Sequence, residues 1–187
     1  MIIDTSYLGS LRSIEDQDIE MMLSWRNAPS VRENMYTRHE ISLVEHQNWW
    51  QKIKESLHHR YFVYECGGVP LGVIGFTGID PENENTSWAF YASPDAPRGT
   101  GSKMEALALE YAFLVLKLHK LQCEVLAFNE PVIKLHKKFG FMVEGILREQ
   151  HKIDGKYVDI YRLGLLKLEW EEKRNDMLAK LLNMAKR

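Results

Sequence analysis

The sequence is short of cysteine, of long apolar runs and of net charge, and each shortage excludes a class of protein. Its 187 residues include two cysteines, Cys66 and Cys123, which are far apart and in no CxxC or Cys/His spacing. A disulfide framework and a metal site are therefore not expected, whereas a reducing, cytoplasmic setting is. No apolar stretch approaches the ~20 residues that a membrane span needs. The formal net charge of −2, with basic residues scattered among acidic ones, offers nucleic acid no basic patch.

Linkers, internal repeats and low-complexity segments are also missing, so residues 1–187 are expected to form one domain. The first residues, Met1 to Asp4, lack the basic and apolar regions of a signal peptide. Apolar periodicity and turn residues predict strands at 7–14, 60–66, 69–79, 86–93, 121–128, 141–152 and 157–165. Helices are predicted at 15–28, 42–57, from the loop at 98–103 to about 119, at 131–139 and from 168 onward. This order indicates an α/β fold, a mixed sheet with helices on both faces.

Capping residues mark several helix boundaries. Ser42, followed three residues later by Glu45, predicts a capping box at the start of the second helix. Asn129 is expected to cap the helix whose first turn holds Pro131, and Gly140 is expected to end that helix. The helix limits therefore rest on chemistry as well as on apolar spacing.

The stretch from Arg98 to Lys103 is the most distinctive in the chain. Two glycines, Gly99 and Gly101, stand between a predicted strand and a predicted helix, with a basic residue on each side. Such a turn directs backbone N–H groups at one point, and the following helix adds the positive end of its dipole. The loop indicates an anion site suited to a pyrophosphate, although taken alone it also fits a plain turn before a core helix. A P-loop is excluded because Ser102 precedes Lys103, so the Gly-Lys-Ser/Thr order is missing.

Two motifs together resemble the GCN5-related N-acetyltransferase (GNAT) family over residues 7–165. Arg98-Gly99-Thr100-Gly101-Ser102 is similar to the family's pyrophosphate loop, although Lys103 stands where a small residue is usual. The second motif runs from Asn129 to Gly140-Phe141, with His136 where the family usually has tyrosine. The resemblance implies a single domain with a central, mixed and mostly antiparallel sheet of about seven strands, flanked by helices, plus an extra C-terminal helix at 168–187. It also implies acetyl transfer from acetyl-CoA to an amine, with no metal.

The resemblance further implies roles for residues on the acetyl-CoA side. It assigns the pyrophosphate to the loop from Arg98 to Lys103, and it assigns an N–H donor for the thioester oxygen to the strand backbone at Phe90, Tyr91 and Ala92. Asn129 is expected to hold the pantetheine arm, to cap its helix, or to do both. His136 takes the place of the general acid for the departing thiolate. Glu124 matches an acidic residue near the acceptor amine, where it could accept the ammonium proton through water.

Plain structural roles stand beside these two catalytic roles. A histidine on an amphipathic helix is often solvated or caps a core, and that alternative applies to His136. A strand carboxylate often faces solvent, and that alternative applies to Glu124. The sequence leaves both alternatives open.

A narrower resemblance lies in the first half of the chain. Four stretches are similar to one branch of the family: Trp25-Arg26-Asn27-Ala28-Pro29, Met35-Tyr36, Ile41-Ser42-Leu43 with His46, and His59-Arg60-Tyr61-Phe62. That branch acetylates the 4-amino group of a UDP-linked 4-amino-4,6-dideoxy sugar in pseudaminic acid biosynthesis. The resemblance implies a UDP-amino-sugar acceptor and the substrate residues Arg26, Asn27, Tyr36, His46 and Thr77. Arg26 is expected to pair with the UDP phosphate.

The residues on the acceptor side also fit structural roles and rival functions. Arg26 could complement a helix C-terminus, His46 could lie on a helix surface, and Tyr36 could belong to the core. Protein acetyltransferases of the RimJ/RimL type share the Trp-Arg-Asn helix end, so a protein or peptide acceptor is a rival. A non-catalytic CoA-binding module is a further rival, because His136 replaces the usual tyrosine. The C-terminal helix either packs on the fold or forms a homodimer contact.

Overall fold

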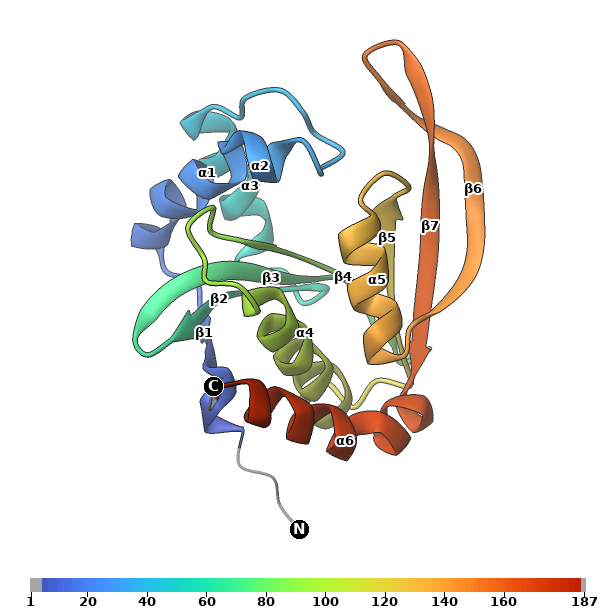
Figure 1. Cartoon of the computed structure of the whole chain (residues 1–187). Helices are drawn as coiled ribbons and strands as arrows, with labels where there is room; N and C mark the ends of the chain where they lie inside the picture. The colour runs from blue at the N-terminus through green and yellow to red at the C-terminus, as the bar shows by residue number, and fades with distance from the viewer. Residues whose placement is uncertain (1–4, 186–187) are drawn as a thin grey trace.

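The computed structural model describes residues 5–185 and shows one seven-stranded sheet with helices on both faces (Figure 1). The strands are β1 (Ser10–Ser13), β2 (His59–Cys66), β3 (Val69–Asp80), β4 (Asn85–Ala92), β5 (Lys120–Leu126), β6 (Met142–Ile153) and β7 (Lys156–Leu166). The helices are α1 (Ile19–Asn27), α2 (Pro29–Arg32), α3 (Leu43–Ile53), α4 (Thr100–Glu110), α5 (Glu130–Phe139) and α6 (Lys167–Ala185). Across the sheet the order is β1-β2-β3-β4-β5-β7-β6. The pair β4–β5 is parallel and the other pairs are antiparallel, so the predicted fold class is confirmed.

Alternation along the strands divides the core between the two faces of the sheet. Tyr64 on β2 and Ile74 on β3 belong to the larger apolar cluster, which includes Met104 of α4. Val63 and Val73, one residue away on the same strands, belong to the smaller cluster with residues of α1 and α3. Helices α1 and α3 therefore cover the face opposite to α4.

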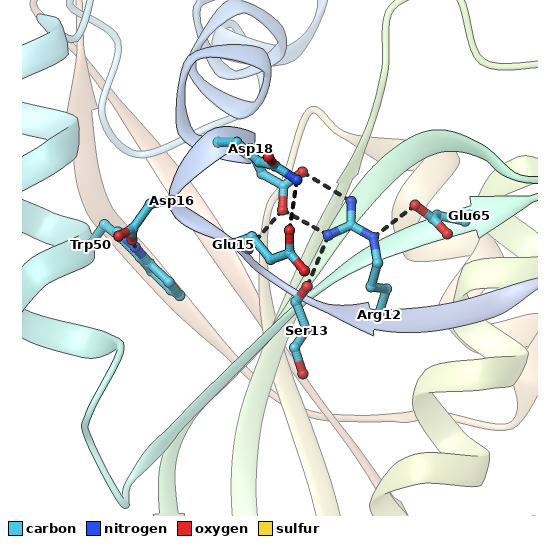
Figure 2. Close-up of polar contacts among 8 residues, drawn as sticks. Arg12, Ser13, Glu15, Asp16, Asp18, Trp50 and Glu65 are labelled. Atoms are coloured by element: carbon cyan, nitrogen blue, oxygen red, sulfur yellow. Dashed lines mark hydrogen bonds and ion pairs between the residues drawn. The ribbon is translucent and has the colours of Figure 1, made fainter.

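A network of ion pairs and hydrogen bonds fixes the α1 and α3 layer to the edge of the sheet (Figure 2). Arg12 of β1 donates to the two carboxylate oxygens of Asp18 at 2.8 and 2.9 Å, and to Glu65 of β2 at 2.8 Å. Asp16 accepts a 2.6 Å hydrogen bond from the indole of Trp50 on α3. Because this network joins two strands to the start of α1 and to α3, it sets the position of both helices over the sheet.

Some predicted boundaries need correction, and the helix expected over 42–57 ends at Ile53. Residues 7–9 were expected to begin the first strand, but Ser6–Leu8 form a 3₁₀ turn and β1 begins at Ser10. The helix expected to reach about 119 is α-helical to Glu110 and continues as a π-helical turn over Tyr111–Val115. The wider turn keeps Ala112 and Phe113 buried against the core, which regular apolar spacing does not reveal.

The capping box expected before α3 is half formed. Ser42 accepts a 3.2 Å hydrogen bond from the backbone N–H of Glu45, as a capping residue does. The Glu45 carboxylate, however, lies 3.1 Å from the imidazole of His39, and this ion pair takes the place of the return bond to Ser42.

Helix α6 closes the fold alongside α4 and α5 (Figure 1). Trp170 and Leu178 are fully buried, and Arg174 donates two hydrogen bonds of 2.5 and 2.7 Å to Glu110 of α4. Of the two expectations for the C-terminal helix, packing on the fold is therefore the one observed, and positions 186–187 of the expected helix lie outside the described residues. Over residues 5–185, none of the helices has the length and apolar character to cross a membrane.

Candidate functional site

The sheet opens between β4 and β5, and a cavity lies in the opening. The described pairing of these strands ends at Ser87 and Gln122. Beyond that point β4 follows β3 as far as Ala92, and β5 follows β7 as far as Leu126. The edge of β4 that faces β5 therefore offers backbone groups that the sheet does not use. The cavity has a volume of about 400 Å³ and is lined by β4, β5, α5 and the segment from Ser30 to Tyr36.

The glycine loop shapes the start of α4. Gly99 has a φ of +94°, in the left-handed region that favours glycine, and Thr100 begins the helix. The Thr100 hydroxyl donates to the carbonyl of Pro97 at 2.7 Å and so tightens the turn. Since the first N–H groups of an α-helix have no intrahelical acceptor, the amides of Gly101 and Ser102 are available to an anion.

The two basic residues of the loop differ in direction. Arg98 is exposed, whereas the ammonium of Lys103 lies 3.7 Å from the Cys66 sulfur at the end of β2. Arg98 is therefore the basic side chain of the loop that stands open to an incoming phosphate. The unusual Lys103 directs its charge toward the neighbouring strand.

His136 of α5 lines the cavity between β4 and β5 and is 3% exposed. Its Nδ1 lies 2.8 Å from Oε1 of Glu105 on α4, and Glu105 has no exposed surface. The rings of Trp88 and Phe141 pack on the imidazole, with centroid distances of 5.4 and 5.2 Å. Burial raises the pKa of Glu105, and the neighbouring imidazole opposes that rise. His136 is thus one half of a buried acid–base pair in the cavity wall, and not a solvated side chain.

Glu124 of β5 is held on both carboxylate oxygens. Oε1 accepts a 2.7 Å hydrogen bond from Nη2 of Arg162 on β7, and Oε2 accepts a 2.9 Å bond from the hydroxyl of Tyr36. Tyr36 also packs on His151 of β6, with a centroid distance of 5.1 Å. Burial and the Glu124 hydrogen bond raise the pKa of Tyr36, so its hydroxyl stays a donor at neutral pH. These side chains join the segment before α3 to β5 and β7 beside the cavity.

A second cavity, of about 330 Å³, lies between the sheet and the helices α1 and α3. It shares Met35 and residues 89–91 of β4 with the first cavity, so the two hollows meet at one strand. Trp49 of α3 and Tyr61 of β2 form much of its aromatic wall, edge to face with centroids 5.1 Å apart. This wall suits a flat ring or the apolar face of a sugar.

Arg26 and His46 bring unsatisfied polar atoms to the second cavity. Arg26 Nη2 donates to the carbonyl of Thr37 at 3.2 Å, whereas Nη1 is buried and has no hydrogen-bond partner among residues 5–185. Burial lowers the pKa of Arg26, yet a guanidinium stays charged in a protein.

The imidazole of His46 adds no positive charge to this cavity. Its Nε2 is buried and, within the described chain, also lacks a partner. Burial, followed by the Arg26 cation, lowers the pKa of His46, so this imidazole is neutral at neutral pH. Arg26 is half-buried, and its buried Nη1 can still donate a hydrogen bond, so the cavity is suited to an anionic ligand.

Three further residues expected at the site have definite places. Asn27 donates to the carbonyl of Ile41 at 2.8 Å and accepts from its N–H at 2.9 Å, so both polar atoms clamp the chain before α3. Thr77 pairs with Ser87 on β4 and lies outside the lining of both cavities. Asn129 lines the first cavity and stands at the expected N-cap position of α5, but its side chain makes no capping hydrogen bond. Its backbone, at φ −83° and ψ 56°, departs from the extended conformation of a capping residue.

The sequence did not reveal Glu105 or Arg162, although each contacts an expected catalytic residue. Glu105 stands among apolar residues of a predicted helix. A carboxylate is seldom buried without a partner, so this fully buried residue was the one indication of a polar contact. Arg162 lies directly opposite Glu124 in the β5–β7 register, which is known only once the strand order is known. Among the residues that the structure describes, no three metal-binding side chains gather at this site or elsewhere.

Known proteins share both the sequence pattern and the fold. The sequence model of one protein family, the acetyltransferase (GNAT) domain, matches residues 10–142 of the chain. The chain is 28% identical over 161 residues to spermidine N(1)-acetyltransferase of Escherichia coli K12, covering 86% of this chain and 87% of that protein. It is 27% identical over 136 residues to acetyltransferase PseH of Campylobacter jejuni, covering 73% of this chain and 84% of that protein.

A solved structure has the same architecture. The crystal structure of spermidine N-acetyltransferase from Vibrio cholerae, in complex with CoA and spermine, matches with a TM-score of 0.81. The match covers 87% of this chain and 97% of that chain at 24% identity. At this identity the likeness shows a common fold.

Proposed function

The chain belongs to the acetyltransferase (GNAT) family, and from that premise we propose that it transfers an acetyl group from acetyl-CoA to the 4-amino group of a UDP-linked 4-amino-4,6-dideoxy sugar. This acceptor is that of the pseudaminic acid branch, which the first half of the chain resembles. The observation that carries the acceptor is the half-buried Arg26 guanidinium, whose buried Nη1 meets no partner in residues 5–185. The diphosphate of UDP is an anion that a guanidinium binds through charge-assisted hydrogen bonds.

The residues of the first cavity fit acetyl-CoA. A side chain at Gly99 would meet no described residue within 4 Å other than its neighbours along the chain, so the approach to the start of α4 is open. The amides of Gly101 and Ser102, with Arg98 beside them, would hold the pyrophosphate. The unused edge of β4 at Phe90–Ala92 would donate an N–H to the thioester oxygen. When bound there, acetyl-CoA supplies an activated acetyl thioester.

Two side chains of the same cavity are suited to moving protons. His136 is the proposed donor to the departing thiolate, because it lines this cavity and an imidazole can pass a proton to sulfur. Glu124, between Tyr36 and Arg162, is the proposed acceptor of the ammonium proton through a water molecule. Asn129 lines this cavity with its amide free of a capping bond, and it is the proposed partner of the pantetheine arm.

Spermidine is the second candidate acceptor, favoured by the 28% identity to the Escherichia coli enzyme. A polyamine carries several positive charges, and the second cavity would meet them with the half-buried cation of Arg26. Glu45 also lines that cavity, but its carboxylate is half exposed and pairs with His39. The charge of the cavity therefore favours the sugar nucleotide over the polyamine.

Equilibrium binding separates the two acceptors without turnover. The protein saturated with CoA is titrated with UDP and, separately, with spermidine in a calorimeter. We expect UDP to bind and Arg26→Met to weaken it about 10- to 100-fold, because a hydrogen bond to a charged group contributes roughly 1.5–3 kcal/mol. Arg148→Met, which removes an exposed cation of β6, serves as the matched control. Spermidine binding that is tighter than UDP binding, and insensitive to Arg26→Met, would replace the proposal with its rival.

A further inference from the structure

We propose that Glu105 is a positioning residue that shares a proton with Nδ1 of His136 and so keeps the imidazole protonated at Nε2. Nδ1 is turned to Glu105 at 2.8 Å, which leaves Nε2 as the ring nitrogen for the cavity that His136 lines. The inference rests on the proposed acetyl transfer and on the role of His136 in it. It does not depend on which amine is the acceptor.

Burial decides how many protons the pair holds. Glu105 is 0% exposed and His136 is 3% exposed, so neither group is solvated by bulk water. A net-neutral pair is less costly there than a pair with one uncompensated charge. Net neutrality requires two protons, one between Oε1 and Nδ1 and one on Nε2. This holds whether the pair is written as carboxylic acid with imidazole or as carboxylate with imidazolium.

The groups around Glu105 and His136 do not change the net neutrality of the pair. Lys138, on the same helix as His136, acts on Glu105 with its positive charge at a distance, and its attraction partly offsets the rise that burial causes in the pKa of Glu105. From β5 the pair faces Cys123, whose thiol stays neutral because burial raises its pKa. From β4 it faces the uncharged ring of Trp88. Oε2 of Glu105 is buried and has no partner among the described residues, so no second donor stabilises a bare carboxylate.

A proton on Nε2 suits the last step of acetyl transfer. As the new C–N bond forms and the C–S bond breaks, the electron pair of the C–S bond goes to sulfur. The Nε2 proton passes to that sulfur and gives the free thiol of CoA. The pair then holds one proton and a buried negative charge, and it recovers the second proton from solvent. This uptake balances the proton that the acceptor ammonium released before it attacked.

Without the Glu105 carboxylate, His136 would no longer be able to donate its Nε2 proton to the departing sulfur. Burial disfavours an unpaired imidazolium, and a neutral imidazole is a far weaker acid. The substitution Glu105→Gln keeps the shape and a hydrogen-bonding group, so the fold is expected to persist. It removes the shared proton and leaves the imidazole neutral.

Nitrogen NMR of histidine-labelled protein tests the assignment without any turnover. We expect the wild-type spectrum to show Nε2 of His136 protonated at neutral pH, with Nδ1 at a shift intermediate between protonated and bare nitrogen. In Glu105→Gln, Nδ1 should move to the shift of a bare, hydrogen-bond-accepting nitrogen. Glu110→Gln, which removes another α4 carboxylate, one bound to Arg174, should leave the His136 signals unchanged. A wild-type spectrum with a bare Nε2 at neutral pH would overturn the proposal.

Steady-state kinetics supply the second test. The substrate is whichever amine the protein acetylates with release of CoA. We expect Glu105→Gln to lower kcat about 10- to 100-fold, because general acid catalysis contributes about 10²–10⁴-fold, while KM for acetyl-CoA changes little. In a His136→Phe background, Glu105→Gln should have no further effect on kcat, since it acts through the imidazole. An equal loss of kcat in both backgrounds would show that Glu105 acts by another route. If the UDP sugar is not acetylated, the NMR result still stands, so the two proposals fail separately.

Discussion

The two cavities meet at one strand, β4, but different parts of the chain form them. The cavity between β4 and β5 is made by the sheet itself, through backbone groups that the diverging strands leave unused and a buried pair between α4 and α5. The cavity under α1 and α3 is made by side chains, and one of them is a cation whose Nη1 has no partner in residues 5–185. We therefore propose that the cavity between β4 and β5 holds acetyl-CoA, and that the side chains of α1 and α3 select the acceptor.

The largest expected effect lies in the cavity between β4 and β5. We expect His136→Phe to lower kcat about 100-fold or more, because it removes the proposed proton donor. KM for acetyl-CoA should change little, since the interaction forms only as sulfur departs. CoA release measured with a thiol reagent gives both constants. His119→Phe, at an exposed position, is the control, and an unchanged kcat in His136→Phe would show that His136 is not the acid.

The next largest effect should fall on the cavity under α1 and α3. Arg26→Met is expected to raise KM for the sugar nucleotide about 10- to 100-fold, because a charge-assisted hydrogen bond to phosphate is lost. KM for acetyl-CoA should not follow. Steady-state kinetics with each substrate varied in turn measure the two constants. Equal rises in both KM values would mean that the two cavities are not divided between donor and acceptor.

A smaller effect is expected at the loop before α4. Gly99→Ala places a side chain at a φ of +94°, and a left-handed L-residue is disfavoured by roughly 1–2 kcal/mol. We expect KM for acetyl-CoA to rise about fivefold or more as the loop shifts away from the pyrophosphate. Gly68→Ala, at a φ of +75° in the β2–β3 turn, introduces similar strain away from the site. If both variants raise KM for acetyl-CoA equally, backbone strain alone explains the weaker binding, and the loop has no specific role.

The smallest expected effect is on stability and its dependence on pH. The hydrogen bonds from Arg12 lower the pKa of Asp18, so the ionised form stabilises the fold. This contribution to stability is complete above the pKa of Asp18 in the unfolded chain, about 3.9. It is lost as pH falls through the lower pKa of Asp18 in the folded protein. We expect Asp18→Asn to lower the free energy of unfolding by about 1 kcal/mol at neutral pH, with the difference shrinking in acid. Urea unfolding at several pH values measures it, and Asp176→Asn, exposed on α6, should show no such trend.

The sequence predicted most of the fold because alternation and turn residues act locally. The seven strands and the α/β class follow from such signals, and so does the helix end at Gly140, which adopts a φ of +107°. The π-helical turn at Tyr111–Val115 was not predicted, since apolar spacing continues smoothly through it. Local sequence signals thus predict the helices and strands, but not the irregular turn within a helix.

The candidate site was predicted less completely because its key contacts are not local. Glu105 meets His136 only when α4 packs beside α5, and Arg162 meets Glu124 only through the β5–β7 register. Thr77 was expected at the acceptor, but its place in the β3–β4 register lies away from both cavities. Such contacts depend on tertiary packing, which a pattern along the chain does not contain.

The central claim is that the cavity under α1 and α3 selects an anionic, nucleotide-linked amine. Its most direct test is CoA release by the purified protein given acetyl-CoA and, in parallel, the UDP-linked 4-amino-4,6-dideoxy sugar, spermidine and a panel of peptides. We expect kcat/KM for the sugar nucleotide to exceed that for the other acceptors by about 100-fold, since a hydrogen bond from Arg26 to a charged phosphate contributes up to roughly 3 kcal/mol. A higher kcat/KM for spermidine or for a peptide would contradict the account.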